Sequence, residues 1–98
     1  MTLTHEQIAA MTCKEVNEEI GIYLGTINID CTPPQVPDYC HDWSHAGRLL
    51  EMFDNFVLNK QGDIHECITQ HSDIYFSAPT PTEAIARCWL EWWEVTHD

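Results

Sequence analysis

The sequence predicts a single layered α+β domain in which about three helices pack on a three-stranded antiparallel sheet. Helix-start signals near both ends precede apolar residues at helical spacing. Three short β-rich runs lie between them, and their connections are too short for crossovers, so the strands must be antiparallel. A length of 98 residues allows one hydrophobic core, so residues 1–98 form one domain. The expected order is helix, helix, strand, strand, strand, helix.

The first quarter of the chain is predicted to be helical. Thr4 followed by Gln7 forms a capping-box signal, and Thr12 followed by Glu15 repeats it. These starts predict a short turn and then a longer helix, for which Gly25 is the expected C-terminal stop. Apolar residues of the longer helix recur at helical spacing: Val16, Ile20, Tyr23 and Leu24.

A proline-rich loop at residues 32–37 follows, and its three prolines exclude a helix or a central strand. The segments on either side are too small to fold alone, so we interpret it as a loop within the domain. The next helix is expected to begin near Asp38 or Asp42, since either side chain can act as an N-cap. Its expected buried face contains Trp43, Ala46, Leu50 and Phe53, with Leu49 beside them.

Three strand-like runs are centred on residues 56–58, 64–69 and 74–76. Residues 60–63 form a turn containing glycine between the first two, and residues 71–73 form a polar turn before the third. The spacing therefore predicts an antiparallel meander.

The last helix has the clearest start in the chain. Thr80 is the expected cap, Pro81 the first helical residue and Glu83 the capping-box partner. Its predicted buried stripe contains Ile85, Cys88, Trp89 and Trp92.

The chain is strongly acidic, with 16 acidic against 4 basic residues and a formal net charge of -12. Such a domain repels the phosphates of nucleic acid and anionic membrane surfaces, so we expect neither as a direct partner. No apolar run approaches the length of a membrane span. The charge attracts a basic surface, and the commonest basic surfaces belong to nucleic-acid-binding proteins and ribonucleoproteins. The alternative interpretation is that the charge only keeps the domain soluble.

We interpret rows of carboxylates without basic neighbours as the partner-binding surface. In this interpretation each carboxylate takes the position that a phosphate of nucleic acid would occupy on the partner. Glu15, Glu18 and Glu19 form such a row, because their spacing puts them on adjacent helix faces. Glu91 and Glu94 are expected to project from the last helix, and Trp93, off the apolar stripe, is a candidate exposed interface anchor. The residues assigned to the acidic surface are Glu6, Glu15, Glu18, Glu19, Asp30, Asp38, Asp42, Glu51, Asp54, Asp63, Glu66 and Asp73.

Neither a glycine-rich phosphate loop nor a Gly-x-Ser-x-Gly elbow is present, so we predict no enzyme activity and no cofactor. The weak metal candidates are Cys31, Cys40, His41 and His45, the two histidines sharing one helical face. We predict no metal, because a Cys-x-x-Cys pair is missing. The five cysteines are odd in number and no signal peptide is evident, so free thiols in a reducing cytoplasm are expected.

Several short motifs follow one another along the chain: residues 6–11 before an acidic helix, residues 39–43 opening the central helix that runs on to residues 49–51, and residues 81–88 in the last helix. In pattern and placement these motifs resemble the phage ABA-sandwich domain family. The resemblance covers nearly the whole chain and implies a phage origin and an α-β-α layered fold. It implies no catalytic residues. The chain departs from the family in its central helix, which is often basic in members and here has only Arg48.

In size and charge the chain is also similar to small acidic phage proteins that act as DNA mimics, among them some anti-CRISPR proteins. We therefore predict a phage-encoded, non-enzymatic inhibitor in the host cytoplasm. It would bind a basic DNA- or RNA-binding surface of a host defence complex, such as a CRISPR effector, and block target DNA binding. One alternative is a phage protein that binds or sequesters a small ligand in a pocket between sheet and helix, with His and Trp side chains as contacts. Another is an assembly accessory without such a site.

Overall fold

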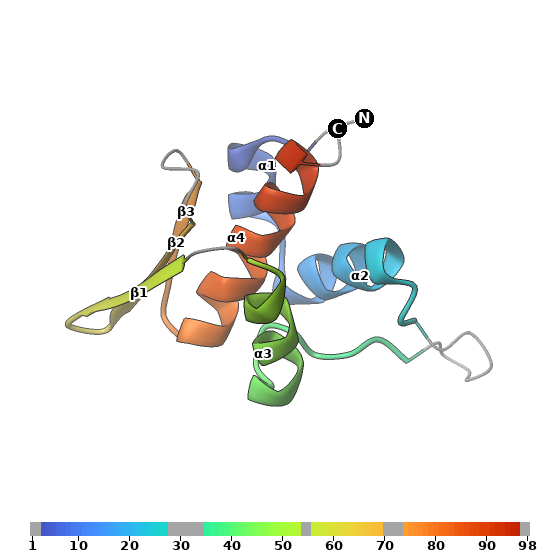
Figure 1. Ribbon diagram of the computed structural model, residues 1–98, viewed down its shortest axis with the longest axis horizontal. Coiled ribbons are helices and arrows are strands. Elements are labelled where there is room, and N and C mark those ends of the chain that lie inside the picture. The colour runs from blue at the N-terminus through green and yellow to red at the C-terminus, as the bar shows by residue number, and fades with distance from the viewer. Residues whose placement is uncertain (1–2, 28–34, 54–55, 70–73, 97–98) are drawn as a thin grey trace.

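The computed structural model describes residues 3–27, 35–53, 56–69 and 74–96. In these residues helices come first, then a three-stranded antiparallel sheet, and then a C-terminal helix packed on that sheet, which confirms the predicted class (Figure 1). The short turn expected before the second helix is itself a helix. The elements are α1 (His5–Ala10), α2 (Cys13–Leu24), α3 (Trp43–Met52), β1 (Phe56–Gln61), β2 (Ile64–Thr69), β3 (Tyr75–Ala78) and α4 (Pro81–Thr96).

The predicted helix caps of the N-terminal part are confirmed. Thr4 accepts a hydrogen bond from the Gln7 backbone and donates its own backbone N–H to the Gln7 side chain. Thr12 and Glu15 form the same reciprocal pair at the start of α2. Gly25 ends α2 with φ +67°, a left-handed conformation that favours glycine because it has no Cβ.

The sheet has the order β1–β2–β3, with both pairings antiparallel. Gln61 pairs with Ile64, so Gly62 and Asp63 form a two-residue turn, and Gly62 takes the positive φ of +60° that this turn needs. One face of β2 and β3 packs against α4. Its buried side chains are Cys67, Thr69, Phe76 and Ala78.

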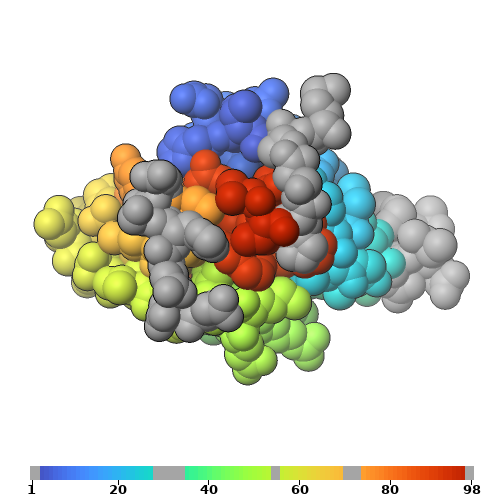
Figure 2. All heavy atoms as spheres, turned by 45° about the horizontal axis from the view of Figure 1, so that its top comes forward, coloured from blue at the N-terminus to red at the C-terminus, as the bar shows by residue number. Residues whose placement is uncertain are grey.

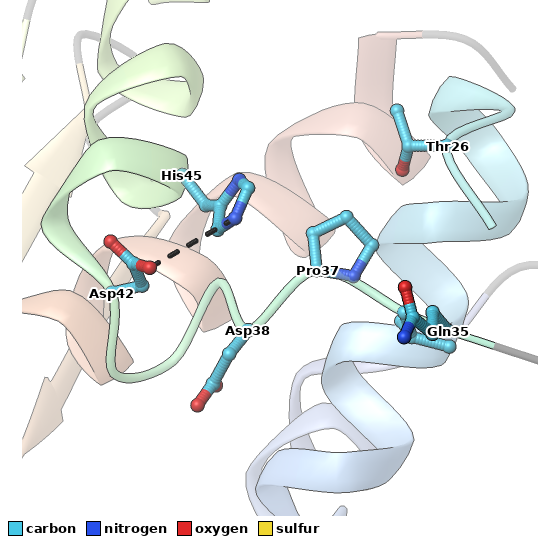
Figure 3. Close-up of a pocket in the computed structure, with 7 residues that line it drawn as sticks. Thr26, Gln35, Pro37, Asp38, Asp42 and His45 are labelled. Atoms are coloured by element: carbon cyan, nitrogen blue, oxygen red, sulfur yellow. Dashed lines mark ion pairs between the residues drawn. The ribbon is translucent and has the colours of Figure 1, made fainter. Parts of the chain in front are cut away.

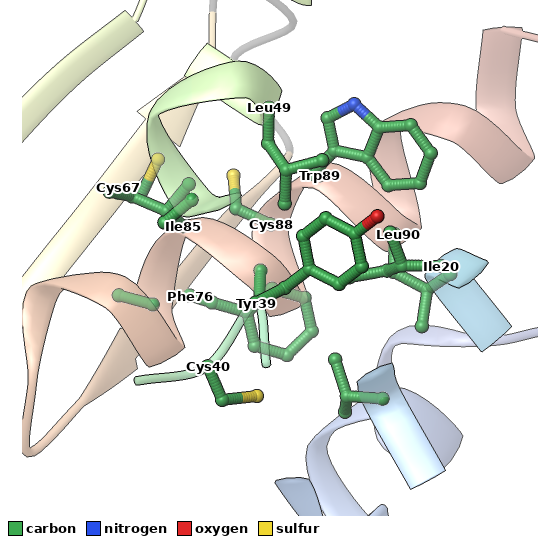
Figure 4. Packing of buried hydrophobic residues seen from close by; sticks show 14 of the residues in the cluster. Ile20, Tyr39, Cys40, Leu49, Cys67, Phe76, Ile85, Cys88, Trp89 and Leu90 are labelled. Carbon is green, nitrogen blue, oxygen red and sulfur yellow. The ribbon is translucent and has the colours of Figure 1, made fainter. Parts of the chain in front are cut away.

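Helix α4 lies at the centre of the molecule, between the sheet and the other helices (Figure 1). Its predicted stripe is confirmed for Ile85, Cys88 and Trp89, which are fully buried (Figure 4), while Trp92 is partly buried. The prediction of a single stripe was too narrow, because residues on other faces of α4 are buried as well. They are Ala84, Ala86, Arg87 and Leu90. A helix enclosed on nearly all sides is the core of the fold.

The predicted buried face of α3 was wrong at one edge. Ala46, Leu49 and Phe53 are buried and Leu50 is partly buried, but Trp43 is 54% exposed. Trp43 and Leu49 lie on opposite flanks of Ala46, because three residues span slightly less than one helical turn. Only one flank can face α4, and the structure places Leu49 there.

Candidate partner-binding surface

Acidic side chains from two segments meet where α2 passes the loop that leads into α3. Glu18 of α2 and Asp38 of the loop line one open hollow, and Asp38 and Asp42 line a second (Figure 3). Glu15 precedes Glu18 by one helical turn and therefore neighbours it on the surface of α2. We call Glu15, Glu18, Asp38 and Asp42 the α2–α3 acidic face.

Asn17 fixes the loop against α2. Its side-chain amide donates a 3.0 Å hydrogen bond to Asp38 Oδ1, and its carbonyl oxygen accepts a 3.1 Å bond from the Cys40 backbone N–H. Thr82 Oγ1 of α4 donates to the Cys40 carbonyl at 2.6 Å, which holds the same loop from the other side. Neither residue was predicted to position the site, because their partners lie 21 to 42 residues away and leave no local signal.

Hydrogen bonds from neutral groups stabilise the ionised form of two carboxylates in this face. The Ser44 hydroxyl and backbone N–H both donate to Asp42 Oδ1, at 2.6 and 2.9 Å, and hold the pKa of Asp42 below its ordinary value. The Thr12 backbone N–H donates to Glu15 and lowers the pKa of that carboxyl in the same way. Both groups therefore carry a full negative charge at neutral pH.

Cations near the face are few. Lys14 lines the first hollow, and it is the one Lys or Arg among the described residues that line either hollow. Two histidines also contact the face: His41 Nδ1 lies 3.1 Å from Asp38 Oδ1, and His45 Nε2 lies 4.0 Å from Asp42 Oδ2. These two pairs attract electrostatically only when the imidazole is protonated. The carboxylates of this face are thus oriented mainly by neutral hydrogen-bond donors, and few cations are near enough to neutralise their charge.

The acids of α4 were predicted to project into solvent, and this was wrong. Glu94 is only 7% exposed and accepts a hydrogen bond from the Tyr23 hydroxyl. Glu91 is mostly buried beside His5, whose Nδ1 lies 3.2 Å from Glu91 Oε1. Burial, followed by the bond to Glu94, raises the pKa of Tyr23. Because α4 is the core helix, its carboxylates face other elements.

The carboxylate of Glu83 on α4 is also hydrogen-bonded within the protein. Arg87 Nε donates to it at 3.1 Å, while Arg87 Nη1 donates to the Ile8 carbonyl of α1 at 2.6 Å. The Cys13 thiol donates to the same carboxylate at 3.3 Å. Glu83 was predicted as a capping-box partner, and Thr80 Oγ1 does accept from its backbone N–H at 3.3 Å. Its carboxylate instead anchors Arg87.

The other predicted acidic residues are spread over the molecule. Glu6 on α1, Glu51 on α3 and Asp63 in the β1–β2 turn are exposed, and Glu66 on β2 is partly buried. Figure 2 shows α1 in blue, the β1–β2 hairpin in yellow and α2 in cyan on different sides of one view. Glu19 faces Tyr23, where its charge contributes to the raised pKa of the phenol. Asp30, Asp54 and Asp73 lie outside the described residues.

Trp93 was expected to be exposed, but it is partly buried. Its ring stacks on Trp89 at a centroid distance of 5.1 Å and on Tyr23 at 5.7 Å. Trp93 follows Trp89 by four residues, so it extends the apolar side of α4. Its role as an interface anchor remains a hypothesis.

The weak metal candidates do not converge. Cys40 is buried, and its thiol points to the Cys13 carbonyl at 3.7 Å, while His41 pairs with Asp38. His45 packs its ring edge-on against Tyr39. Cys31 lies outside the described residues, and within those residues no group of three His, Cys, Asp or Glu side chains could hold a metal ion. Among the residues that the structure describes, Cys13, Cys40, Cys67 and Cys88 are free thiols.

The two hollows do not lie between the sheet and a helix, where the alternative prediction placed a ligand pocket. Cys67, Phe76, Ile85 and Cys88 fill the space between sheet and α4 (Figure 4). The hollow lined by Glu18 and Asp38 measures about 460 Å³, and the one lined by Asp38 and Asp42 measures about 560 Å³. Both are open to solvent. Their volumes suit a small ligand, and each is lined by two carboxylates together with apolar groups, including Val36 in both.

Comparison with protein families, with curated proteins and with solved structures found nothing that matches this chain. The resemblance to the phage ABA-sandwich domain family therefore remains a hypothesis. Within the part of the chain that the structure describes, each helix is too short or too polar to cross a membrane.

Proposed function

We propose that the protein is a non-enzymatic binding protein whose α2–α3 acidic face occupies a basic, nucleic-acid-binding surface of another protein. One observation carries the proposal. Three of the four carboxylates of this face, those of Asp38, Asp42 and Glu15, accept hydrogen bonds from Asn17, Ser44 and Thr12, which are neutral donors. These donors fix the positions of the oxygens without adding positive charge, and among the described residues the nearby cationic groups are few: Lys14, and His41 and His45 when protonated.

Such an arrangement suits a partner rich in arginine and lysine. Charge-assisted hydrogen bonds between guanidinium and carboxylate are about twice as strong as neutral ones and are often bidentate. Carboxylates that are already oriented lose little side-chain freedom on binding, which favours affinity. The strong net charge of -12 would also speed the encounter with a basic surface.

Together with the resemblance of its short motifs to a phage family, this leads to a more specific proposal. The partner is a host defence complex, such as a CRISPR effector, and the protein blocks binding of target DNA by occupying the effector's nucleic-acid site.

The experiment is an affinity capture from host lysate with two matched baits. The test bait carries Glu18→Lys and Asp38→Lys, and the control bait carries Glu6→Lys and Glu51→Lys, which make the same change of charge on exposed positions of other elements. We expect the unchanged protein and the control to retain the same ribonucleoprotein or DNA-binding protein, and the test bait to lose it.

A competition measurement completes the test. Labelled target DNA should be displaced from the captured partner by the unchanged protein, less so as salt rises, because exposed charges are screened beyond about 8–10 Å. If the partner binds DNA and this protein together, or if both baits capture it equally, the proposal is wrong.

The second candidate is a protein that binds or sequesters a small cationic ligand in the hollows lined by Glu18, Asp38 and Asp42. Its support is the size of these hollows. Native mass spectrometry of the purified protein would detect a bound small molecule. A small molecule lost from the Glu18→Lys, Asp38→Lys variant, with no captured partner, would favour this function.

A further inference from the structure

We propose that two copies of the chain associate through their β1 strands, which pair antiparallel about a two-fold axis and join the two sheets into one. The proposal does not depend on the proposed function. It starts from an exposed apolar strand: β1 is exposed at all six positions, although its first three residues are apolar. Phe56, Val57 and Leu58 are 41%, 52% and 39% exposed.

β1 has an open edge for such a pairing. Within the described residues it pairs with β2 on one side and lies beyond the layer of helices (Figure 1). In an antiparallel ladder alternate residues direct their backbone N–H and C=O groups to opposite sides, so part of the β1 backbone faces away from β2. A long apolar edge of this kind is a template for a further strand.

The other edge of the sheet is less suitable. β3 has four residues, and its end is covered by α1, because the His5 ring stacks on Phe76 at 4.2 Å and lies 5.9 Å from Tyr75. A new strand would meet this ring. β1 is therefore the edge at which the sheet can grow.

Charge indicates that the occupant is a second copy. Two chains of net charge -12 repel one another over most of their surfaces. β1 has no carboxylate, and its one charged residue is Lys60, which attracts a second acidic chain and repels a basic partner. The strand that fits beside β1 must be apolar in part and must not place a positive charge opposite Lys60, and β1 itself meets this condition when Phe56 faces Lys60.

The pleat of the strand restricts the register. Residues that face each other must lie on the same face of the joined sheet, so the axis must pass through a residue and not between two. An axis at Leu58 places the two Leu58 side chains against each other and each Phe56 opposite the Lys60 of the other copy. The Lys60 stem then covers the aromatic ring with its ammonium nearby, a favourable arrangement. Like charges do not face each other in this register.

The test is the association state of the full chain, measured by sedimentation equilibrium over a wide range of protein concentration. Leu58→Arg puts two like charges at the axis and should weaken the dimer at least tenfold. Ile22→Arg is the matched control, since Ile22 is 60% exposed on α2, and it should leave the dimer unchanged. Circular dichroism would verify that both variants are folded.

Two further readouts distinguish this contact from an acidic-face interaction. Added salt should strengthen the dimer, because it screens the repulsion between the two chains, whereas it weakens binding of a basic partner. Leu58→Cys should form a disulfide-linked dimer when oxidised by diamide, and Ile22→Cys should not exceed the background of the unchanged chain. A protein that is monomeric at every concentration, or a dimer insensitive to Leu58→Arg, would overturn the proposal.

Discussion

The carboxylates of α4 and those of the α2–α3 acidic face have the same chemistry and opposite surroundings. Glu94 on α4 is enclosed and bonded to Tyr23, whereas Asp42 at the start of α3 is exposed and bonded to Ser44. In the sequence both appear as acids near helix ends. The difference teaches that the charge available to a partner is smaller than the acid count, because distance from the central helix decides which carboxylates face outward.

The largest expected effect comes from weakening the packing of α4, the helix that encloses one group of carboxylates and leaves the other outside. Trp89→Ala truncates a fully buried side chain of α4 and should lower the free energy of unfolding by about 3–5 kcal/mol. Urea unfolding followed by circular dichroism measures this. Trp43→Ala is the matched control, since the same truncation at a 54% exposed residue should have little effect. Equal losses at both positions would show that α4 is not the centre of the core.

The next effect tests whether the α4 acids serve the fold. Arg87→Met removes the guanidinium donor from the Glu83 carboxylate, which keeps the Cys13 thiol, and from the Ile8 carbonyl, which keeps the Met11 backbone N–H. We expect a loss of about 1.5–3 kcal/mol, as for hydrogen bonds to charged groups, because Glu83 is partly exposed and water can replace some of the contact. Adding Glu83→Gln to Arg87→Met should recover part of the loss. A double variant less stable than the single one would contradict this account.

A smaller effect is expected at the Tyr23–Glu94 contact. Tyr23→Phe removes one hydrogen bond to a buried carboxylate and should cost about 1 kcal/mol. The raised pKa of Tyr23 also predicts a pH dependence. Since the folded state holds the phenol proton more tightly, this contribution is complete below pH 10 or so, the ordinary tyrosine value, and is lost as pH rises further.

The measurement compares thermal unfolding of the unchanged protein and of Tyr23→Phe between neutral and alkaline pH. The difference in stability between the two proteins should shrink above the ordinary tyrosine pKa. A difference that stays constant would mean that the phenol proton is not involved.

The smallest effect concerns the outward carboxylates. The lowered pKa of Asp42 means that this group stabilises the fold above its ordinary value, near pH 4, and that this stabilisation is lost as pH falls through the lower folded pKa. Asp42→Asn should therefore flatten the acid limb of a stability profile slightly and leave neutral stability almost unchanged. Thermal unfolding between pH 2 and 7 measures this. An effect as large as that of Arg87→Met would place Asp42 with the structural acids.

Local signals were sufficient for much of the fold. The starts at Thr4 and Thr12 and the stop at Gly25 each depend on contacts within a few residues and were predicted; the start at Asp42 was one of two predicted alternatives, the other being Asp38. The strand order followed in the same way from short connections. What depends on distant partners could not be predicted.

The carboxylates of the α2–α3 acidic face were among the acidic residues named from the sequence. The sequence could not show, however, which of the named acids would lie together on one face. Asn17 of α2 donates a hydrogen bond to Asp38, which lies in another segment of the chain. Glu94 is bonded to Tyr23, 71 residues away in the sequence, and is therefore not available on the surface. The choice between Trp43 and Leu49 as the buried flank of α3 likewise depends on where α4 lies. Such choices are made by packing, and periodicity alone leaves them open.

The exposure of Trp43 gives the molecule a built-in optical reporter. Three of its four tryptophans lie on α4, wholly or partly inside the core, so collisional quenchers such as acrylamide should reach Trp43 first. This indole directly follows Asp42 at the start of α3. A macromolecule docking on the neighbouring carboxylates would shield it and shift its emission to shorter wavelength, so that complex formation can be followed without attaching a dye.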